Sequence, residues 1–147
     1  MYQFVLITHI LAATLWTGGH LLLAFGFLPA ALRHRDVALI EAFEQRFEPI
    51  GLPALVIQVV SGLWLANALQ PDWSRWIGFS DPASSLIFLK LLLLLSTVAL
   101  AVHARIKLIP NLRPATLPAL AWHIRGVTLL SVLFVVAGVG LRTRGFW

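Results

Sequence analysis

Four long apolar runs alternate with three short polar connections along the chain. Each run approaches the roughly 20 residues that a helix needs to cross the hydrocarbon core of a bilayer. We predict membrane-spanning helices at about 3–27, 49–69, 84–107 and 118–141. The connections are too short for a further globular domain, so we expect all 147 residues to form a single all-α domain, a bundle of four transmembrane helices.

The first two connections have patterns of their own. Between residues 32 and 48, Val37, Ile40 and Phe43 recur at helical spacing among charged residues, which predicts a short amphipathic helix on the membrane surface. The second connection, residues 70–83, contains Trp73 and Trp76, and tryptophan is typical of the boundary between lipid and water. We therefore expect both connections to lie at the membrane surface.

Composition supports the membrane assignment and limits the side chains that could bind a metal ion. Hydrophobic residues make up 59% of the chain and charged residues only 12%, against roughly 25% charged residues in soluble domains. The chain has no cysteine, which excludes disulfides and thiolate metal sites. Its single methionine is Met1, so the soft sulfur ligands that select Cu(I) are scarce.

Lysine and arginine are unevenly distributed between the two predicted sides of the membrane. The first and third connections carry Arg33, Arg35, Arg46, Arg105, Lys107 and Arg113, whereas the opposite side carries Arg75, Arg142 and Arg144. Because basic residues are enriched in cytoplasmic loops, we expect both termini on the outer, periplasmic side of a bacterial-type inner (plasma) membrane. Topology and contact with lipid headgroups then account for the net charge of +5, and no nucleic-acid partner is expected.

The first predicted helix contains two histidines within its apolar run. At about 100° per residue, His9, Trp16 and His20 fall on one stripe of the helix. Ionisable side chains are costly in lipid and therefore indicate function. His9 and His20 are separated by roughly 16 Å along the helix axis, so they cannot ligate one iron ion.

The other ionisable residues that we single out inside the predicted spans are Lys90, His103, His123 and Arg125. With the orientation above, Lys90 lies at the depth of His9, and the two form an outer polar layer. His103 and His123 lie near the depth of His20, and the three histidines form an inner layer accompanied by Arg125. The sequence thus predicts two polar layers, one toward each side of the membrane.

Imidazoles from facing helices commonly hold haem iron in a bundle, and this interpretation explains three histidines at one depth best. We predict a b-type haem that serves electron transfer or a redox reaction with a quinone, a small oxidant or another redox partner. The candidate metal ligands are His9, His20, His103 and His123. Trp16, Lys90 and Arg125 complete the candidate cofactor-binding residues, with Arg125 facing a haem propionate. A copper ion held by imidazoles and a metal-free proton relay remain as alternatives.

Two short motifs resemble known membrane families. His9-x6-Trp16-Thr17-Gly18-Gly19 resembles the start of the small CopD-like proteins, which are associated with copper resistance. Arg46-Phe47, followed by Gly51, Pro53, Gly62 and Lys90, is similar to the HemJ-like proteins, four-helix membrane proteins that bind haem b and oxidise protoporphyrinogen IX.

The HemJ-like resemblance implies that His9 and Lys90 contribute to haem binding or activity. Two positions depart from that pattern. Phe88 stands where HemJ-like proteins have a histidine, and the fourth helix carries His123 and Arg125 in place of an Asn-Glu-x-Pro pattern. Copper transport or handling and HemJ-like protoporphyrinogen oxidation are therefore kept as alternatives to haem-based redox function. Small residues on the first two predicted helices also leave room for a homodimer.

Overall fold

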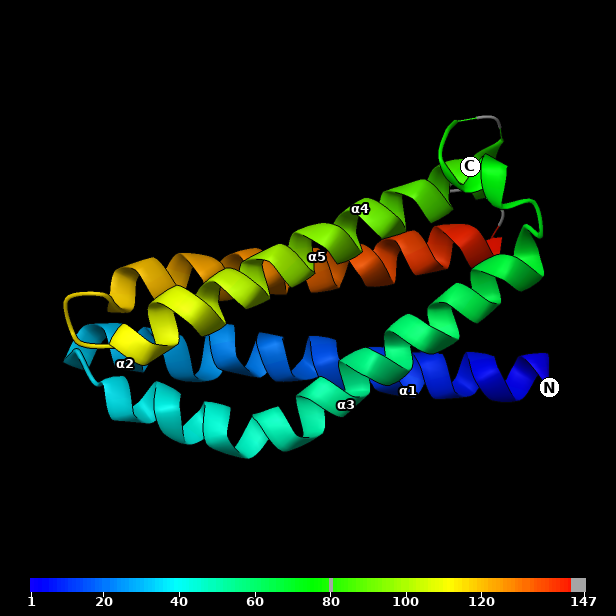
Figure 1. Cartoon of the computed structure of the whole chain (residues 1–147). Coiled ribbons are helices and arrows are strands. Elements are labelled where there is room, and N and C mark those ends of the chain that lie inside the picture. The colour runs from blue at the N-terminus through cyan, green and yellow to red at the C-terminus, as the bar shows by residue number, and fades with distance from the viewer. Residues whose placement is uncertain (80, 144–147) are drawn as a thin grey trace.

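The computed structural model describes residues 1–79 and 81–143, and over these residues it contains helices and turns but no strand (Figure 1). The α-helices are α1 (Tyr2–Leu21), α2 (Leu28–His34), α3 (Val37–Leu69), α4 (Pro82–His103) and α5 (Leu117–Thr143). One π-helical turn, Leu22–Phe27, joins α1 to α2, and another, Ala104–Leu108, extends α4. Short 3-10 turns cover Trp73–Trp76 and Ile109–Asn111.

Four continuous helical segments are long and apolar enough to cross a membrane: Tyr2–His34, Val37–Leu69, Pro82–Asn111 and Leu117–Thr143. Their number and helical class confirm the predicted four-helix, all-α integral membrane architecture. The first segment continues beyond the predicted end at residue 27 through α2, and the third continues beyond residue 107 through the 3-10 turn Ile109–Asn111. The protein is therefore a multi-pass membrane protein.

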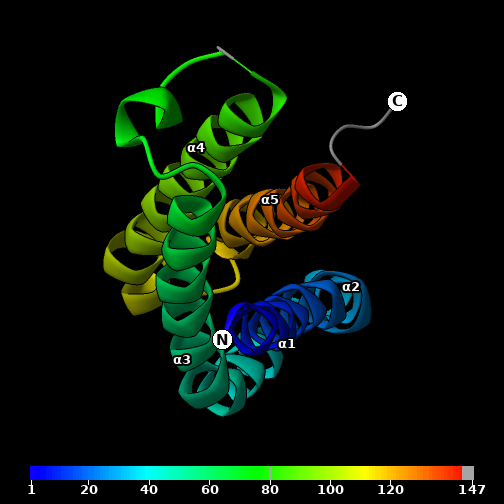
Figure 2. The same ribbon diagram turned by 90° about the vertical axis from the view of Figure 1, so that its right-hand side faces the viewer.

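Successive long helices run antiparallel, so both described ends of the chain lie at the same end of the bundle (Figure 1). Helix α1 packs chiefly on α3, and α4 packs chiefly on α5. Contacts between α1 and α5 join these two units, which we call the α1–α3 pair and the α4–α5 pair (Figure 2). The site residues are distributed over both pairs.

Helix α3 differs from the prediction. The prediction of a separate surface helix before a span at 49–69 is wrong, because one helix runs without interruption from Val37 to Leu69. It begins at Asp36, whose carboxylate accepts a hydrogen bond from the Leu39 amide at 3.2 Å. Pro49 and Pro53 lie inside this helix. Proline lacks the amide donor that an interior position needs, and α3 bends along its course (Figure 1).

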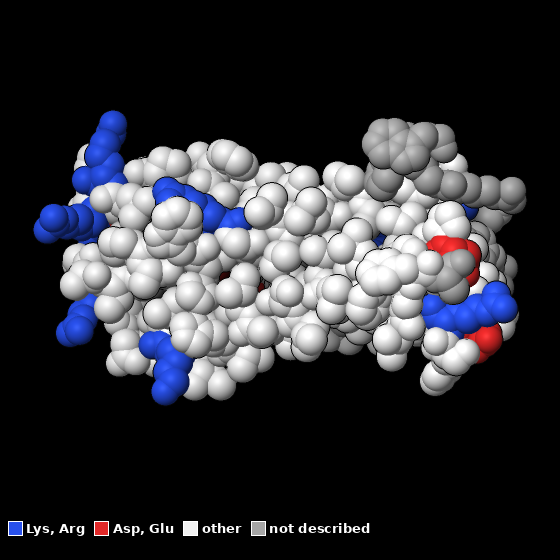
Figure 3. Space-filling model, turned by 90° about the horizontal axis from the view of Figure 1, so that it is seen from above, with Lys and Arg blue, Asp and Glu red and all other residues white. Residues whose placement is uncertain are grey.

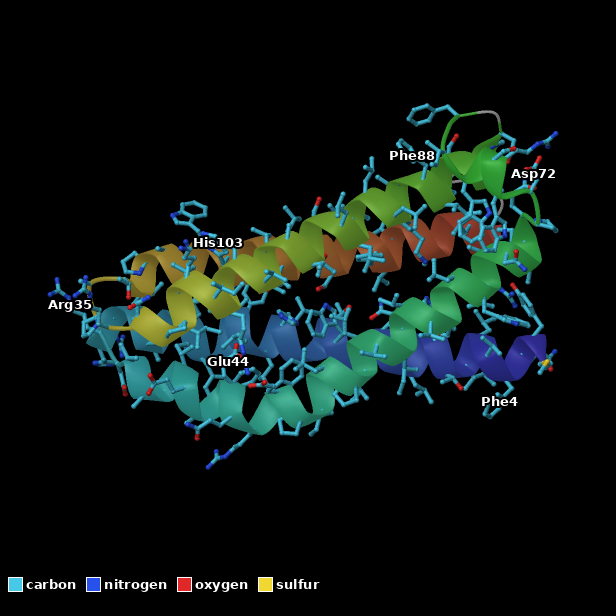
Figure 4. The ribbon with its side chains drawn as sticks, viewed as in Figure 1. Phe4, Arg35, Glu44, Asp72, Phe88 and His103 are labelled. Atoms are coloured by element: carbon cyan, nitrogen blue, oxygen red, sulfur yellow. The ribbon has the colours of Figure 1, made fainter. Side chains whose placement is uncertain are left out.

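The connection between α3 and α4 is held by local hydrogen bonds. The carboxylate of Asp72, labelled in Figure 4, accepts from the Ser74 hydroxyl at 2.6 Å and from the Ser74 amide at 3.0 Å. These donors keep the pKa of Asp72 below its ordinary value. The indoles of Trp73 and Trp76 lie 5.7 Å apart between ring centroids.

On the face that Figure 3 shows, basic residues gather at the end of the bundle opposite the described chain ends, whereas the other end shows both signs of charge. Arg35 marks the first end and Asp72 the second (Figure 4). Arg144, which entered the argument for orientation, lies outside the described residues. The placement of the basic end in the cytoplasm stays a prediction.

Candidate functional site

Helices α4 and α5 bring His103 and His123 into direct contact. Nδ1 of His103 lies 2.8 Å from Nε2 of His123, and the rings are nearly parallel, with an interplanar angle of 18° and centroids 4.9 Å apart. Nδ1 of His123 also lies 3.1 Å from the Ala119 carbonyl oxygen. Since a carbonyl oxygen only accepts, His123 donates from Nδ1, and its Nε2 accepts the proton of His103 Nδ1.

The antiparallel register of α4 and α5 explains this contact. Gly126 lies opposite Leu100, and a Cβ at position 126 would stand 3.2 Å from the Leu100 side chain. Three residues further along α4 and three residues back along α5, the same register places His103 opposite His123. The small residue at 126 thus lets the two helices approach where the imidazoles meet. His103 lies on the exposed side of the bundle (Figure 4).

His20 lies in the other helix pair. Its Nδ1 donates to the Trp16 carbonyl oxygen at 2.9 Å, and its ring lies 4.3 Å from the Trp16 ring between centroids. Phe47 of α3 meets the His20 ring edge-on at 5.8 Å. Trp16 itself is buried, with 6% of its surface exposed. His20 is therefore enclosed by aromatic rings between α1 and α3.

The predicted inner layer of three histidines divides accordingly. His103 and His123 meet across α4 and α5, whereas His20 bonds to its own helix. Within residues 1–79 and 81–143, no group of three or more His, Cys, Asp or Glu side chains is placed to hold a metal ion. The structure thus assembles two of the predicted ligands in one place and leaves the third elsewhere.

His9 is bound within the α1–α3 pair. Its Nδ1 lies 2.9 Å from the Ser61 hydroxyl, which itself donates to the Ile57 carbonyl oxygen. Nδ1 of His9 is therefore the donor to Ser61. A Cβ at Gly62 would stand 3.0 Å from Cε1 of His9, so the ring rests directly on the glycine backbone.

Lys90, the predicted companion of His9, extends toward α5. A Cβ at Gly138 would lie 3.6 Å from its Nζ, which places the ammonium group against the backbone of α5. Lys90 is close enough for its charge to act on His9. The two predicted members of the outer layer are therefore within electrostatic range of each other, although they belong to different helix pairs.

Arg125 has an aromatic partner on its own helix. Its guanidinium carbon lies 5.3 Å from the centroid of the Trp122 ring, at the distance of a cation–π contact. Both side chains are on the exposed side of α5, and Trp122 has 71% of its surface exposed. The predicted role of Arg125 toward a propionate stays a prediction.

The sequence pattern does not predict the ion pair that the structure shows between Glu48 and Arg105. The Arg105 guanidinium donates to both carboxylate oxygens of Glu48, to one of them at 2.8 Å, and so connects α3 with the turn after α4. Glu44 lies one turn before Glu48 and within electrostatic range of Arg105. The sequence places Glu48 and Arg105 near the ends of two spans on the same predicted side of the membrane, but it does not indicate that α3 and the turn after α4 are neighbours.

These features define a multi-pass, four-helix membrane protein in which the exposed imidazole of His103 meets the half-buried imidazole of His123 across α4 and α5. Residues 41–141 match the family CopD, described as Copper resistance protein D, and the chain belongs to this family. The predicted CopD-like resemblance is therefore confirmed. The matched range includes Lys90, His103 and His123, and it begins after His9 and His20. No curated protein and no solved structure matches the chain.

Proposed function

We propose that this protein handles copper in a bacterial-type inner membrane, in copper transport or tolerance, by binding the ion at the His103–His123 pair. The observation that carries the proposal is the 2.8 Å separation between Nδ1 of His103 and Nε2 of His123. The membership of the chain in the CopD family supports copper as the metal. With both termini outside, the site would lie in the cytoplasmic half of the bundle.

The nitrogen–nitrogen distance suits a metal ion. A metal–imidazole bond is about 2.0 Å long, so two imidazole nitrogens bound at a right angle lie about 2.8 Å apart. The rings need only turn toward a common point beside the line that joins them. The hydrogen bond from His123 to the Ala119 carbonyl fixes one ring and its tautomer, as partners of metal ligands commonly do. The proton now on Nδ1 of His103 would move to its Nε2.

The donor set favours one oxidation state. Cu(I) is selected by thiolate and thioether ligands, whereas imidazoles suit Cu(II). The chain has no cysteine and no methionine beyond Met1. We therefore infer that the site takes Cu(II).

The test is a titration of the purified full chain with Cu²⁺, followed by equilibrium binding and electron paramagnetic resonance. We expect nitrogen couplings in the wild-type spectrum. His103→Ala and His123→Ala should each weaken binding by at least about tenfold, the scale on which even the partners of metal ligands act. His34→Ala is the matched control, because His34 is exposed and its Nε2 is hydrogen-bonded to the guanidinium of the adjacent Arg33. A wild-type protein without bound copper, or variants that bind as tightly, would overturn the proposal.

Haem b is the second candidate, and His20 favours it. Nδ1 of His20 donates to the Trp16 carbonyl, which leaves Nε2 for a metal, and Trp16 and Phe47 supply aromatic walls. Such a haem would exchange electrons with a quinone or a small oxidant, or would oxidise a porphyrinogen. Protein produced with ample haem should then show haem bands in a reduced-minus-oxidised spectrum, and His20→Ala should remove them. A spectrum without these bands rejects haem and leaves the copper proposal intact.

A further inference from the structure

Arg125 is a cation of the membrane-spanning helix α5 that has no acidic partner in the part of the chain that the structure describes. The described residues form two ion pairs, and neither includes Arg125. Its side chain is exposed and contacts the ring of Trp122. A charged side chain in a membrane-spanning segment is costly unless it pairs with another group or reaches the headgroups. Arg125 therefore needs a partner from outside the chain.

The exposed face of α5 changes from apolar to polar at Arg125. Leu129, Val132 and Val136 follow Arg125 at spacings of three and four residues, and all three are exposed, as expected of side chains that contact lipid tails. Trp122 lies one turn nearer the end of the bundle opposite the described chain ends, which we call the basic end. Exposed tryptophan is typical of the headgroup level of a bilayer. Arg125 and Trp122 thus lie where the lipid tails end and the headgroups begin.

The side chain of Arg125 extends toward the basic end. Side chains on a helix tilt toward its N-terminus, and α5 begins with Leu117 at the basic end. The guanidinium carbon lies 5.3 Å from the ring centroid of Trp122, which is three residues nearer the start of α5. A basic side chain at the edge of the hydrocarbon reaches the headgroups in this direction.

The contact with Trp122 leaves Arg125 able to bind an oxygen ligand. A cation is attracted to the face of an aromatic ring without an oxygen acceptor, so the contact does not satisfy the N–H groups of the guanidinium. These donors form a planar fork that matches two oxygens of a phosphate group. The geometry therefore suits a phosphate at the headgroup level.

The surrounding charge favours a ligand that is negative overall. Residues 105–125 contain four basic side chains and no acidic one. Glu48 of α3 pairs with one of the four, Arg105, and the excess stays positive. Basic clusters beside a membrane-spanning helix attract anionic lipids. A zwitterionic headgroup carries a cation of its own, which these side chains repel.

We propose that Trp122 and Arg125 form a binding site for the phosphate group of an anionic lipid. The guanidinium binds the phosphate oxygens, and the indole lies beside the upper part of the acyl chains. The bilayer itself supplies this ligand, because the exposed face of a membrane-spanning helix is in contact with lipid. The site adjoins the proposed copper ligand His123 along α5, but it does not depend on the copper proposal.

The experiment measures lipid binding to the full-length, copper-free protein in detergent by native mass spectrometry. Dioleoylphosphatidylglycerol and dioleoylphosphatidylcholine are the probes, because they share acyl chains and differ in headgroup charge. Arg125→Gln removes the cation, and Trp122→Leu removes the ring. Arg35→Gln is the matched control, because it removes the same charge from an exposed position at the tip of the basic end (Figure 4). Inorganic phosphate is added as a competitor in a separate titration.

We expect the wild type and Arg35→Gln to bind the first phosphatidylglycerol molecule at least about fivefold more tightly than phosphatidylcholine, the scale of one basic side chain at an anionic surface. Arg125→Gln should lose this preference. Trp122→Leu should weaken phosphatidylglycerol binding about two- to fivefold, the scale of an exposed cation–π contact.

Equal affinity of the wild type for the two lipids would overturn the proposal. A preference that persists in Arg125→Gln would do the same, and an equal loss in Arg35→Gln would assign the preference to net charge instead of this site. Unchanged binding by Trp122→Leu would remove the ring from the site. Displacement of phosphatidylglycerol by an equal concentration of inorganic phosphate would show a site for free phosphate and reject a lipid site. Because copper is absent, each of these results leaves the proposed function standing.

Discussion

The two helix pairs use glycine in different ways. In the α1–α3 pair, aromatic rings rest on glycine backbone, with Phe47 on Gly19 and His9 on Gly62. In the α4–α5 pair, the flexible side chains of Leu100 and Lys90 approach Gly126 and Gly138, and a Cβ at these positions would stand 3.2 and 3.6 Å away. The first pair is therefore packed by rigid groups and the second by groups that can move.

This difference separates two kinds of histidine. His9 donates to Ser61 and lies over Gly62, so its ring is part of the packing between α1 and α3. His103 lies on the exposed side of the bundle, and its ring contacts the ring of His123. A polar group that is held by packing between two helices contributes to the stability of the fold, and this contribution explains its presence. A polar pair at the surface of a membrane bundle calls for a ligand.

The largest effect on stability should come from Gly19→Ala. The added methyl group would occupy the space of the Phe47 ring, and overpacking of this kind costs about 1–3 kcal/mol. Thermal or detergent-induced unfolding, followed by tryptophan fluorescence, measures the loss. His20 also touches Phe47, so displacement of that ring should change the environment of Trp16 and His20.

Gly18→Ala is the matched control for this prediction. Nothing lies within 4 Å of a Cβ at position 18, and alanine favours a helix over glycine by roughly 1 kcal/mol at most. We expect the control to be as stable as the wild type or slightly more stable. Equal stability of Gly19→Ala and Gly18→Ala would show that Phe47 is free to move, and the contrast between the helix pairs would fail.

Hydropathy and helical periodicity predicted much of the fold. The four spans follow from the length of the apolar runs, and the stripe of His9, Trp16 and His20 does face α3, where Ser61 and Phe47 meet it. Depth matching also placed His103 near His123. Each of these results depends either on the pattern within one helix or on the depth of a residue along the membrane normal. Both kinds of information can be obtained from a single sequence.

The sequence could not predict which helices are neighbours. His20 was grouped with His103 and His123 because their depths agree, but depth leaves the choice of partner helix open. Packing of α1 on α3 places His20 against Phe47 instead. The charged residues at 41–48 led to a predicted start of the span at residue 49, although α3 begins at Val37. The partner of a charged residue also depends on which helices are neighbours. Glu48 is paired with Arg105 from a distant segment, and local polarity shows no sign of such a partner.

The smaller effect on stability should come from His9→Ala, and it tests the comparison most directly. The variant removes the hydrogen bond to Ser61, and such interhelical bonds in membranes are worth about 0.6 kcal/mol on average and at most about 1.7 kcal/mol. Ser61 keeps its bond to the Ile57 carbonyl, so no buried donor is left without a partner. We therefore expect a modest decrease in unfolding temperature, below that of Gly19→Ala. Copper affinity, measured as for His103→Ala, should stay at the wild-type value, because α4 and α5 hold the ligands. If His9→Ala weakened copper binding as strongly as His103→Ala, His9 would belong to the metal site. The distinction between a histidine that serves packing and a histidine that binds metal would then fail.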